Sequence, residues 1–172
     1  MRSVILFIAT SLDGYIAGKD GNLDWLFTDG DYGYGNFINS IDTTLMGYNT
    51  YNDILSFGEY PYPDKKNYVF SRTHKKEDDH PTEFIYTDIP KFVRELKNKK
   101  GKNIWLVGGG QVNTVLWNEG LIDELIISVH PVILGEGVTL FSGKKQVKNL
   151  KLNSMQKFDN GLVQLRYTIL NK

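Results

Sequence analysis

The feature that most limits how this chain can fold is a short apolar run that ends in three consecutive glycines. Residues 104–107 have the composition of a buried β-strand, residues 108–110 are all glycine, and residues 112–118 carry apolar side chains at helical spacing. A strand, a glycine turn and a helix in this order can form a phosphate site, because glycine lets an anion approach the backbone and the helix start offers unpaired N–H groups. Glycines after a strand can also do no more than reverse the chain. The motif alone therefore does not decide between a phosphate site and a simple chain reversal, and the other segments of the chain must be considered with it.

Length, charge and the absence of cysteine exclude several classes of function. A chain of 172 residues is long enough for one domain over residues 1–172. Its 20 basic and 20 acidic residues balance, so no charge pattern points to nucleic acid or to an anionic membrane. The basic run at 97–102 is expected to be a solvated helix end. Without cysteine there are no disulfides, thiolate nucleophiles or cysteine-bound metals, and no apolar run reaches the roughly 20 residues of a membrane span. We expect a cytoplasmic protein without a metal site.

Predicted strands and helices alternate along the first two thirds of the chain, and strands alone follow. This order predicts an α/β fold with a central, mostly parallel sheet, flanking helices and a C-terminal antiparallel hairpin. The segment 29–35, rich in Gly, Asp and Tyr, is expected to be irregular. Strands are predicted at 3–9, 43–46, 67–71, 84–86, 104–107, 124–129 and 162–170, and helices around 37–41, 50–55, 89–97 and 112–118.

Two more segments place polar groups at the carboxyl ends of predicted strands. After the strand at 43–46 comes Gly47, and Asn49 and Thr50 follow near the first turn of a helix. Their side chains can cap that helix, or they can bind a phosphate at the same helix start. A third strand ends in Ser71, Arg72 and Thr73. A lone arginine is usually a surface charge, but a guanidinium between two hydroxyls suits a phosphomonoester.

The three segments together describe the phosphates of one cofactor. Carboxyl ends of parallel strands lie along one edge of a sheet, where ligands of open α/β folds bind. Two helix starts suit a pyrophosphate and a separate arginine suits one further phosphate, which favours NADP over NAD. The fingerprint G-x-G-x-x-G with an acid about 20 residues later is absent. The predicted cofactor site is therefore of another kind.

At this point the sequence resembles a known family. Five motifs occur in order: SLDGYIA at 11–17, LMGYNTY at 45–51, VFSR at 69–72, VGGGQV at 107–112, and DEL with PVILGEG between 123 and 137. Together they resemble the dihydrofolate reductase-like superfamily, in the branch similar to the C-terminal reductase domain of the bifunctional deaminase-reductase of bacterial riboflavin biosynthesis. The resemblance covers essentially the whole chain.

The resemblance implies a dihydrofolate reductase-like fold that binds NADPH and commonly forms a homodimer. The nicotinamide is implied near the end of the first strand, the pyrophosphate between the two glycine-containing helix starts, and the adenosine 2′-phosphate at Ser71 and Arg72. The implied cofactor residues are Ala9, Thr10, Ile16, Gly18, Gly47, Tyr48, Asn49, Thr50, Ser71, Arg72, Thr73, Val107, Gly108, Gly109, Gly110, Gln111 and Val112.

Two departures from the family pattern concern charge. Dihydrofolate reductases usually have an arginine where this chain has Tyr48, so a preference for NADP rests on Arg72, with Lys75 or Lys76 as possible helpers. They also carry a pterin-binding carboxylate on the helix after the tryptophan loop. The corresponding segment 36–40 has no acid. Asp31, just before it, is the nearest candidate, although Asp in a glycine-rich loop often only shapes a turn.

The remaining candidates have a structural and a functional interpretation. Asp13 can hold the turn after the first strand or, beside the implied nicotinamide, contact a polar substrate. Trp25 and Phe37 are expected at the substrate pocket, and core packing would explain Trp25 equally well. His130 is expected to be structural.

The sequence thus predicts an NADPH-dependent reductase that moves hydride from nicotinamide C4 to a small heterocyclic or sugar-like substrate. The proton would come from water, Asp31 or Asp13. A 5-amino-6-(5-phosphoribosylamino)uracil reductase is a narrower form of this hypothesis. Two observations argue against this narrower form. The zinc signature of the deaminase partner domain requires cysteine, which this chain lacks. The chain also has no further basic cluster that could bind a substrate phosphate. The alternative is a catalytically silent nucleotide-binding or sensor protein.

Overall fold

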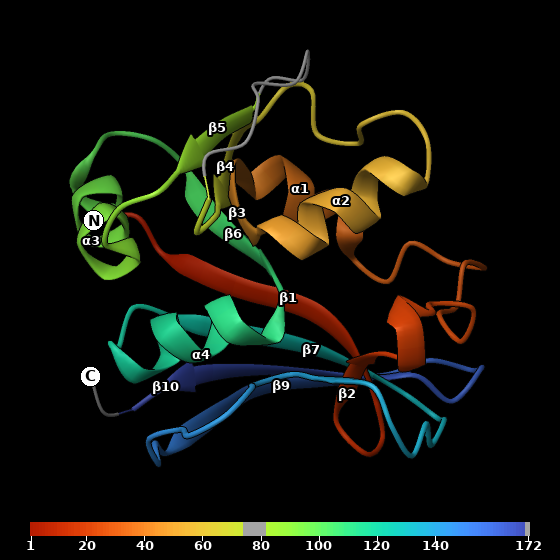
Figure 1. Cartoon of the computed structure of the whole chain (residues 1–172). Coiled ribbons are helices and arrows are strands. Elements are labelled where there is room, and N and C mark those ends of the chain that lie inside the picture. Colours follow the sequence, from red (N-terminus) through yellow and green to blue (C-terminus); the bar gives the residue numbers. More distant parts are fainter. Residues whose placement is uncertain (74–81, 171–172) are drawn as a thin grey trace.

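An eight-stranded sheet forms the centre of the protein (Figure 1). The computed structural model describes residues 1–73 and 82–170. The sheet order is β5-β4-β3-β6-β1-β7-β10-β9, and β2 pairs with β8 in a separate two-stranded sheet. The strands are β1 (Val4–Ser11), β2 (Tyr15–Ala17), β3 (Ile41–Gly47), β4 (Lys66–Phe70), β5 (Thr82–Ile85), β6 (Asn103–Gly108), β7 (Glu124–His130), β8 (Val138–Thr139), β9 (Leu150–Lys157) and β10 (Val163–Ile169).

Neighbouring strands from β5 to β7 are parallel, and the last two strands are antiparallel. β1 lies between β6 and β7, with Leu6 opposite both Leu106 and Leu125. β10 runs antiparallel to β7 on one side and to β9 on the other. The predicted mostly parallel sheet with its C-terminal antiparallel hairpin is therefore confirmed.

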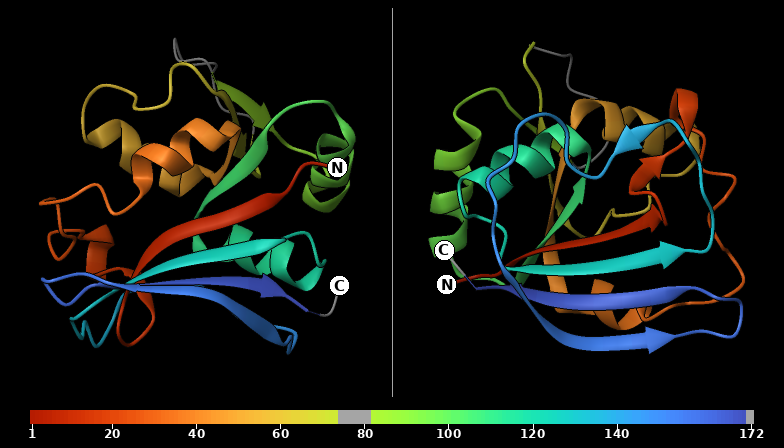
Figure 2. Two further views of the ribbon diagram at one scale, coloured as in Figure 1. Left: turned by 180° about the vertical axis from the view of Figure 1, so that it is seen from behind. Right: turned by 90° about the horizontal axis from the view of Figure 1, so that it is seen from below.

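Helices cover both faces of the sheet (Figures 1 and 2). They are α1 (Tyr34–Ser40), α2 (Tyr48–Ser56), α3 (Ile89–Asn98) and α4 (Gly110–Asn118), with a short 3-10 helix η1 at Lys19–Gly21. Successive side chains of a strand point to opposite faces. Leu6 accordingly packs with α3 and α4, and Ile5 packs with α1 and α2. Covering both faces explains why β1 is apolar along nearly its whole length.

The start of α3 follows from its sequence. The Asp88 carboxylate accepts a hydrogen bond from Lys91 N at 3.0 Å, and a proline occupies the first turn. Both are favourable at a helix start. The helix end differs from expectation: Lys97 is 6% exposed, and its ammonium lies 2.6 Å from the Asp123 carboxylate. The prediction of a solvated basic run is therefore wrong for this residue.

Several elements differ from the sequence-based prediction. The strands β2, β8 and β9 were not predicted. Every residue of β9 is exposed, so its sequence carries no buried alternation. β2 and β8 exist through their mutual pairing. α2 and α4 begin at Tyr48 and Gly110, directly after glycine. In the described ranges, the helices are all too short or too polar to cross a membrane.

Candidate functional site

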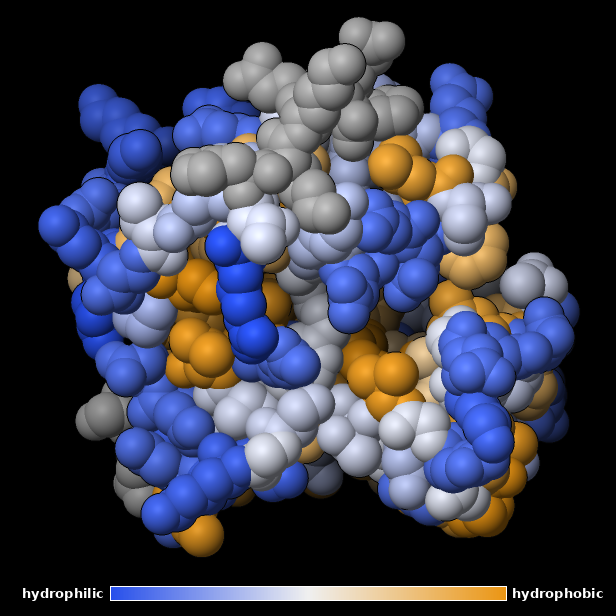
Figure 3. Space-filling model, viewed as in Figure 1, coloured by the Kyte–Doolittle hydropathy of each residue, from blue (hydrophilic) through white to orange (hydrophobic). Residues whose placement is uncertain are grey.

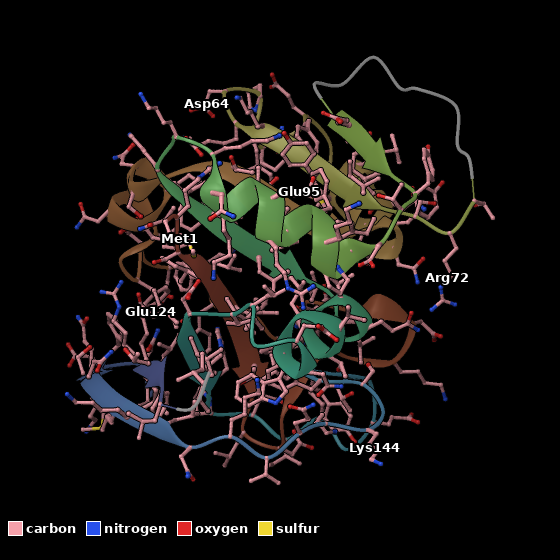
Figure 4. The ribbon with its side chains drawn as sticks, turned by 90° about the vertical axis from the view of Figure 1, so that its left-hand side faces the viewer. Met1, Asp64, Arg72, Glu95, Glu124 and Lys144 are labelled. Carbon is pink, nitrogen blue, oxygen red and sulfur yellow. The ribbon has the colours of Figure 1, made fainter. Side chains whose placement is uncertain are left out.

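The predicted site residues lie where parallel strands end. β1, β3, β4, β6 and β7 end at Ser11, Gly47, Phe70, Gly108 and His130, at the same edge of the sheet. In Figure 4, Arg72 projects from the side of the molecule opposite Met1 and Glu124, which lie at the amino ends of strands. Ligands of open α/β sheets bind at the carboxyl edge.

The starts of α2 and α4 lie side by side at this edge. A methyl group added to Gly109 would lie 3.2 Å from Thr50 Oγ1 and 4.0 Å from Ile16 Cδ1. One added to Gly47 would lie 3.2 Å from Val112 Cγ2. Segments that are far apart in the sequence therefore meet around one point.

Both helix starts leave their N–H groups without a side-chain cap. Gly47 and Gly109 occupy the N-cap positions, and neither cap has a side-chain hydrogen bond. Asn49 and Thr50 lie within α2, so their interpretation as helix caps is wrong. The first N–H groups of a helix have no partner within the helix, and the helix dipole makes this end attractive to anions. Two such ends side by side can hold a pyrophosphate.

Close packing supplies a second reason for the glycine triplet. A methyl group added to Gly110 would lie 2.4 Å from the Thr139 carbonyl oxygen and 2.5 Å from Ser142 Oγ. Ser142 N also donates to Gly110 O at 3.2 Å. Contacts of 2.4–2.5 Å are below normal van der Waals separation, so only glycine fits here. No local sequence pattern signals this close approach, because the partner segment lies some 30 residues away.

Arg72 reaches the start of α4. Its guanidinium donates to Gln111 Oε1 at 3.1 Å. Ser71 Oγ donates to Thr73 O at 2.8 Å and accepts from Thr73 N at 3.3 Å, which forms a local turn around the exposed arginine. The third predicted phosphate contact is thus adjacent to the other two. Lys75 and Lys76 lie outside the described residues.

A cavity of about 500 Å³ opens at the carboxyl end of β1. It adjoins the glycine triplet through Ile8, a lining residue whose Cδ1 would lie 3.6 Å from a methyl group added to Gly108. It has mainly apolar and aromatic walls, and its size is typical of a site for a small organic ligand. Ala9, from the end of β1, borders it. Figure 3 shows hydrophobic residues around a hollow to the right of centre. The lining residues are Phe7, Ile8, Ala9, Leu26, Phe27, Gly30, Asp31, Tyr32, Tyr34, Trp105, Ser128, His130 and Leu162.

The two candidate acids have different surroundings. Asp31 lines the cavity, and its Oδ1 accepts from Gly35 N at 2.8 Å. Asp13 accepts from Ser11 Oγ at 2.6 Å, from Gly135 N at 2.8 Å and from Leu134 N at 3.1 Å. The hydrogen bond from Ser11, followed by those from the two backbone N–H groups, lowers the pKa of Asp13. These bonds agree with the interpretation that Asp13 holds the turn after β1.

Trp25 and Phe37 pack against residues that line the cavity. Phe37 is buried and packs edge-on against Phe7 and Trp105, which line the cavity. Trp25 packs edge-on against His130, with ring centroids 5.2 Å apart. Both contact lining residues, and neither is among the lining residues themselves.

Sequence reasoning missed the polar group that β7 contributes to the cavity and that Gln164 of β10 supports. His130 Nδ1 lies 3.2 Å from Ser128 O, and burial lowers the pKa of His130. Gln164 Nε2 donates to Ser128 Oγ and to Tyr32 O, both at 3.0 Å. Such a group has no local motif, because its members come from two strands and a distant loop.

Strand order, helix placement and a ligand-sized cavity at the carboxyl edge define a dihydrofolate reductase-like α/β protein. The chain belongs to the RibD C-terminal domain family, which matches residues 2–164.

Relatives span nearly the whole chain. It is 42% identical to YyaP, an uncharacterized protein of Bacillus subtilis strain 168, over 96% of this chain and 94% of that one. The crystal structure of a putative riboflavin biosynthesis protein from Shewanella sp. PV-4 superposes with a TM-score of 0.89 at 30% identity, covering 99% of this chain and 100% of that chain.

A more distant structure shares the fold. The diaminohydroxyphosphoribosylaminopyrimidine deaminase/5-amino-6-(5-phosphoribosylamino)uracil reductase of Thermotoga maritima superposes with a TM-score of 0.74 at 16% identity. The match covers 98% of this chain and 57% of that longer one.

Proposed function

We propose that this protein is an oxidoreductase that uses NADPH to reduce a small heterocyclic or sugar-like substrate. One observation carries the proposal: the starts of α2 and α4 and Arg72 meet at the sheet edge beside a cavity. Membership of the RibD C-terminal domain family supports it, and so does the reductase activity in the name of the Thermotoga relative.

The residues at this edge fit the parts of NADPH in turn. Two uncapped helix starts, at Gly47 and Gly109, suit the pyrophosphate. The exposed guanidinium of Arg72 suits the 2′-phosphate. Ala9 borders the cavity, so a nicotinamide beside it would face a substrate there. When bound, NADPH supplies the hydride.

Asp31 is the proposed acid for the accompanying proton. Hydride addition needs a proton on the neighbouring atom, and a proton donor must come within hydrogen-bond reach of it. Asp31 borders the cavity, whereas Asp13 accepts three hydrogen bonds from its own turn and the loop at 134–135. Water remains the other source.

Replacing Arg72 with alanine is expected to weaken NADPH binding and to leave NADH binding nearly unchanged. A charge-assisted hydrogen bond is worth about 1.5–3 kcal/mol, or roughly 10- to 150-fold in the dissociation constant. Quenching of Trp105, which borders the cavity, reports both titrations. Arg94→Ala is the control, because this arginine pairs with Glu119 at the surface. Equal losses of affinity for NADPH and NADH would show that Arg72 does not contact the 2′-phosphate.

Three narrower predictions accompany this proposal. Binding of NADPH without turnover of any substrate would favour the silent nucleotide-binding alternative. A cytoplasmic location stays a prediction. So does the homodimer implied by the family resemblance, which the exposed apolar side chains of the edge strand β9, Leu150, Leu152 and Met155, would suit.

A further inference from the structure

We propose that His130 is a substrate-binding residue of the cavity, and that its Nε2 accepts a hydrogen bond from an N–H or O–H group of the substrate. This inference rests on the proposed function, because it takes the cavity that Ala9 borders as the substrate site. It gives a role in binding to a residue for which the sequence alone predicts a structural role.

A backbone contact fixes the tautomer of His130. Its Nδ1 lies 3.2 Å from the carbonyl oxygen of Ser128, two residues earlier on β7. A carbonyl oxygen can only accept, so Nδ1 carries the proton of this hydrogen bond. In a neutral imidazole the other ring nitrogen then has no proton. Nε2 is therefore a hydrogen-bond acceptor.

The surroundings keep the imidazole neutral and in place. His130 is 4% exposed, and burial lowers its pKa from the usual 6.5, so the ring is uncharged at pH 7. Trp25 packs edge-on against the ring, with centroids 5.2 Å apart, and the Phe27 ring lies at 4.9 Å. These contacts and the bond to Ser128 orient the acceptor before a ligand arrives, which lowers the entropy cost of binding.

Within the described ranges, Nε2 is an acceptor without a donor. No described residue forms a hydrogen bond with it, and the His130 side chain lines the cavity. A buried acceptor that lacks a partner is unfavourable. A donor group on a bound molecule removes this penalty, whereas an ether or carbonyl oxygen at the same place leaves it. The cavity should therefore select molecules with an N–H or O–H group at this position.

A neighbouring polar residue on β7 supports this interpretation. Ser128 also lines the cavity, and its hydroxyl oxygen accepts from Gln164 Nε2 at 3.0 Å. Ser128 and His130 lie two residues apart on one strand, so their side chains share a face of the sheet. The other walls of the cavity are mainly apolar. A few converging polar groups in an apolar cavity are typical of a site that orients its ligand.

Two substitutions separate the binding role from a structural one. In His130→Gln the amide oxygen can lie near the position of Nε2 and accept there. The shorter side chain of His130→Asn can keep a donor for Ser128 O, but has no acceptor near the position of Nε2. A purely structural role predicts that Asn, which keeps the internal hydrogen bond, is tolerated at least as well as Gln. The binding role predicts that Gln alone preserves ligand recognition.

The test uses two probes that differ in a single donor. Indole has a ring N–H, and benzofuran has an oxygen acceptor in its place with nearly the same size and shape. Equilibrium dialysis would measure binding of both probes to the wild-type protein and to the two variants. The preference for indole over benzofuran is expected to fall roughly 5- to 150-fold in His130→Asn, as for a buried polar group left unpaired, and to be largely kept in His130→Gln.

Comparison across the variants isolates the contact with His130. Asp31 also lines the cavity and offers an acceptor for indole, but that contribution would be the same in all three proteins. The same preference for indole in the wild type and both variants overturns the inference. Failure of indole to bind to the wild-type protein overturns it as well.

A second measurement does not depend on how well the variants fold. Nitrogen-15 NMR of the wild-type protein, with its three histidines labelled, distinguishes protonated from unprotonated ring nitrogens. Saturating indole is expected to shift the resonance of the unprotonated Nε2 of His130, and benzofuran should leave it nearly unchanged. An unshifted Nε2 resonance with bound indole contradicts the proposed hydrogen bond.

Failure of this inference can be told apart from failure of the proposed function. NADPH binding would be measured in the same dialysis. If NADPH binds and the preference for indole does not depend on residue 130, the reductase proposal stands and only the role of His130 is wrong. If NADPH does not bind, the proposed cofactor site is wrong, whatever the two probes show.

Discussion

Replacing Lys97 with alanine is expected to lower the free energy of unfolding by about 3–5 kcal/mol, because the buried carboxylate of its partner loses its counter-ion. The Lys97 ammonium lies 2.6 Å from Asp123 Oδ2, and both side chains are largely buried. The same carboxylate oxygen accepts from Val4 N at 2.7 Å. One ion pair thus joins the end of α3 to the starts of β1 and β7. Urea denaturation followed by circular dichroism measures the change.

A neighbouring pair on the same helix provides the control. Arg94 of α3 pairs with Glu119, and both side chains are about half exposed. Surface pairs contribute about 0–1 kcal/mol, so Arg94→Ala should have a small effect. The double variant Lys97→Met, Asp123→Asn removes both buried charges, keeps an oxygen that can accept from Val4 N, and should recover most of the loss. A loss below about 1 kcal/mol in Lys97→Ala would contradict the assigned role of the pair.

Gly137→Ala is expected to cost about 3 kcal/mol, through backbone strain and a collision with β2. Gly137 has φ +149°, a conformation that alanine rarely adopts, and an added methyl group would lie 2.1 Å from the Ala17 carbonyl oxygen. The substitution must push β8 away from β2. The segment that follows β8 also packs against Gly110, so we expect weaker NADPH binding as well.

Gly135→Ala separates the two causes. Gly135 also has a positive φ, of +77°, but an added methyl group would meet no atom within 4 Å. Its cost should be limited to the strain of the left-handed conformation, about 1–2 kcal/mol. Thermal and urea unfolding of the two variants measure the difference. Equal losses would show that the contact with Ala17 is unimportant.

Sequence patterns were sufficient for the layers of the fold. Apolar runs such as residues 104–107 and the helical spacing of 89–97 have local causes, since burial on both faces or on one helix face leaves a period in the sequence. The edge strand β9 left no such period, because none of its residues is buried. The helix starts at Tyr48 and Gly110 were placed late by two residues, because glycine N-caps give a weak signal.

For the site, the sequence by itself identified three strand ends with phosphate-binding chemistry, since glycines, helix starts and an arginine are local features. Only the tertiary structure decided that Thr50, Arg72 and the glycine triplet adjoin one another, and that Asp31 borders the cavity while Asp13 holds a loop. It also decided that Lys97 is buried and that β7 contributes His130 to the cavity. The physical reason is that these roles depend on distances between segments far apart in the chain. Such distances are set by sheet order and by packing, which no local pattern records.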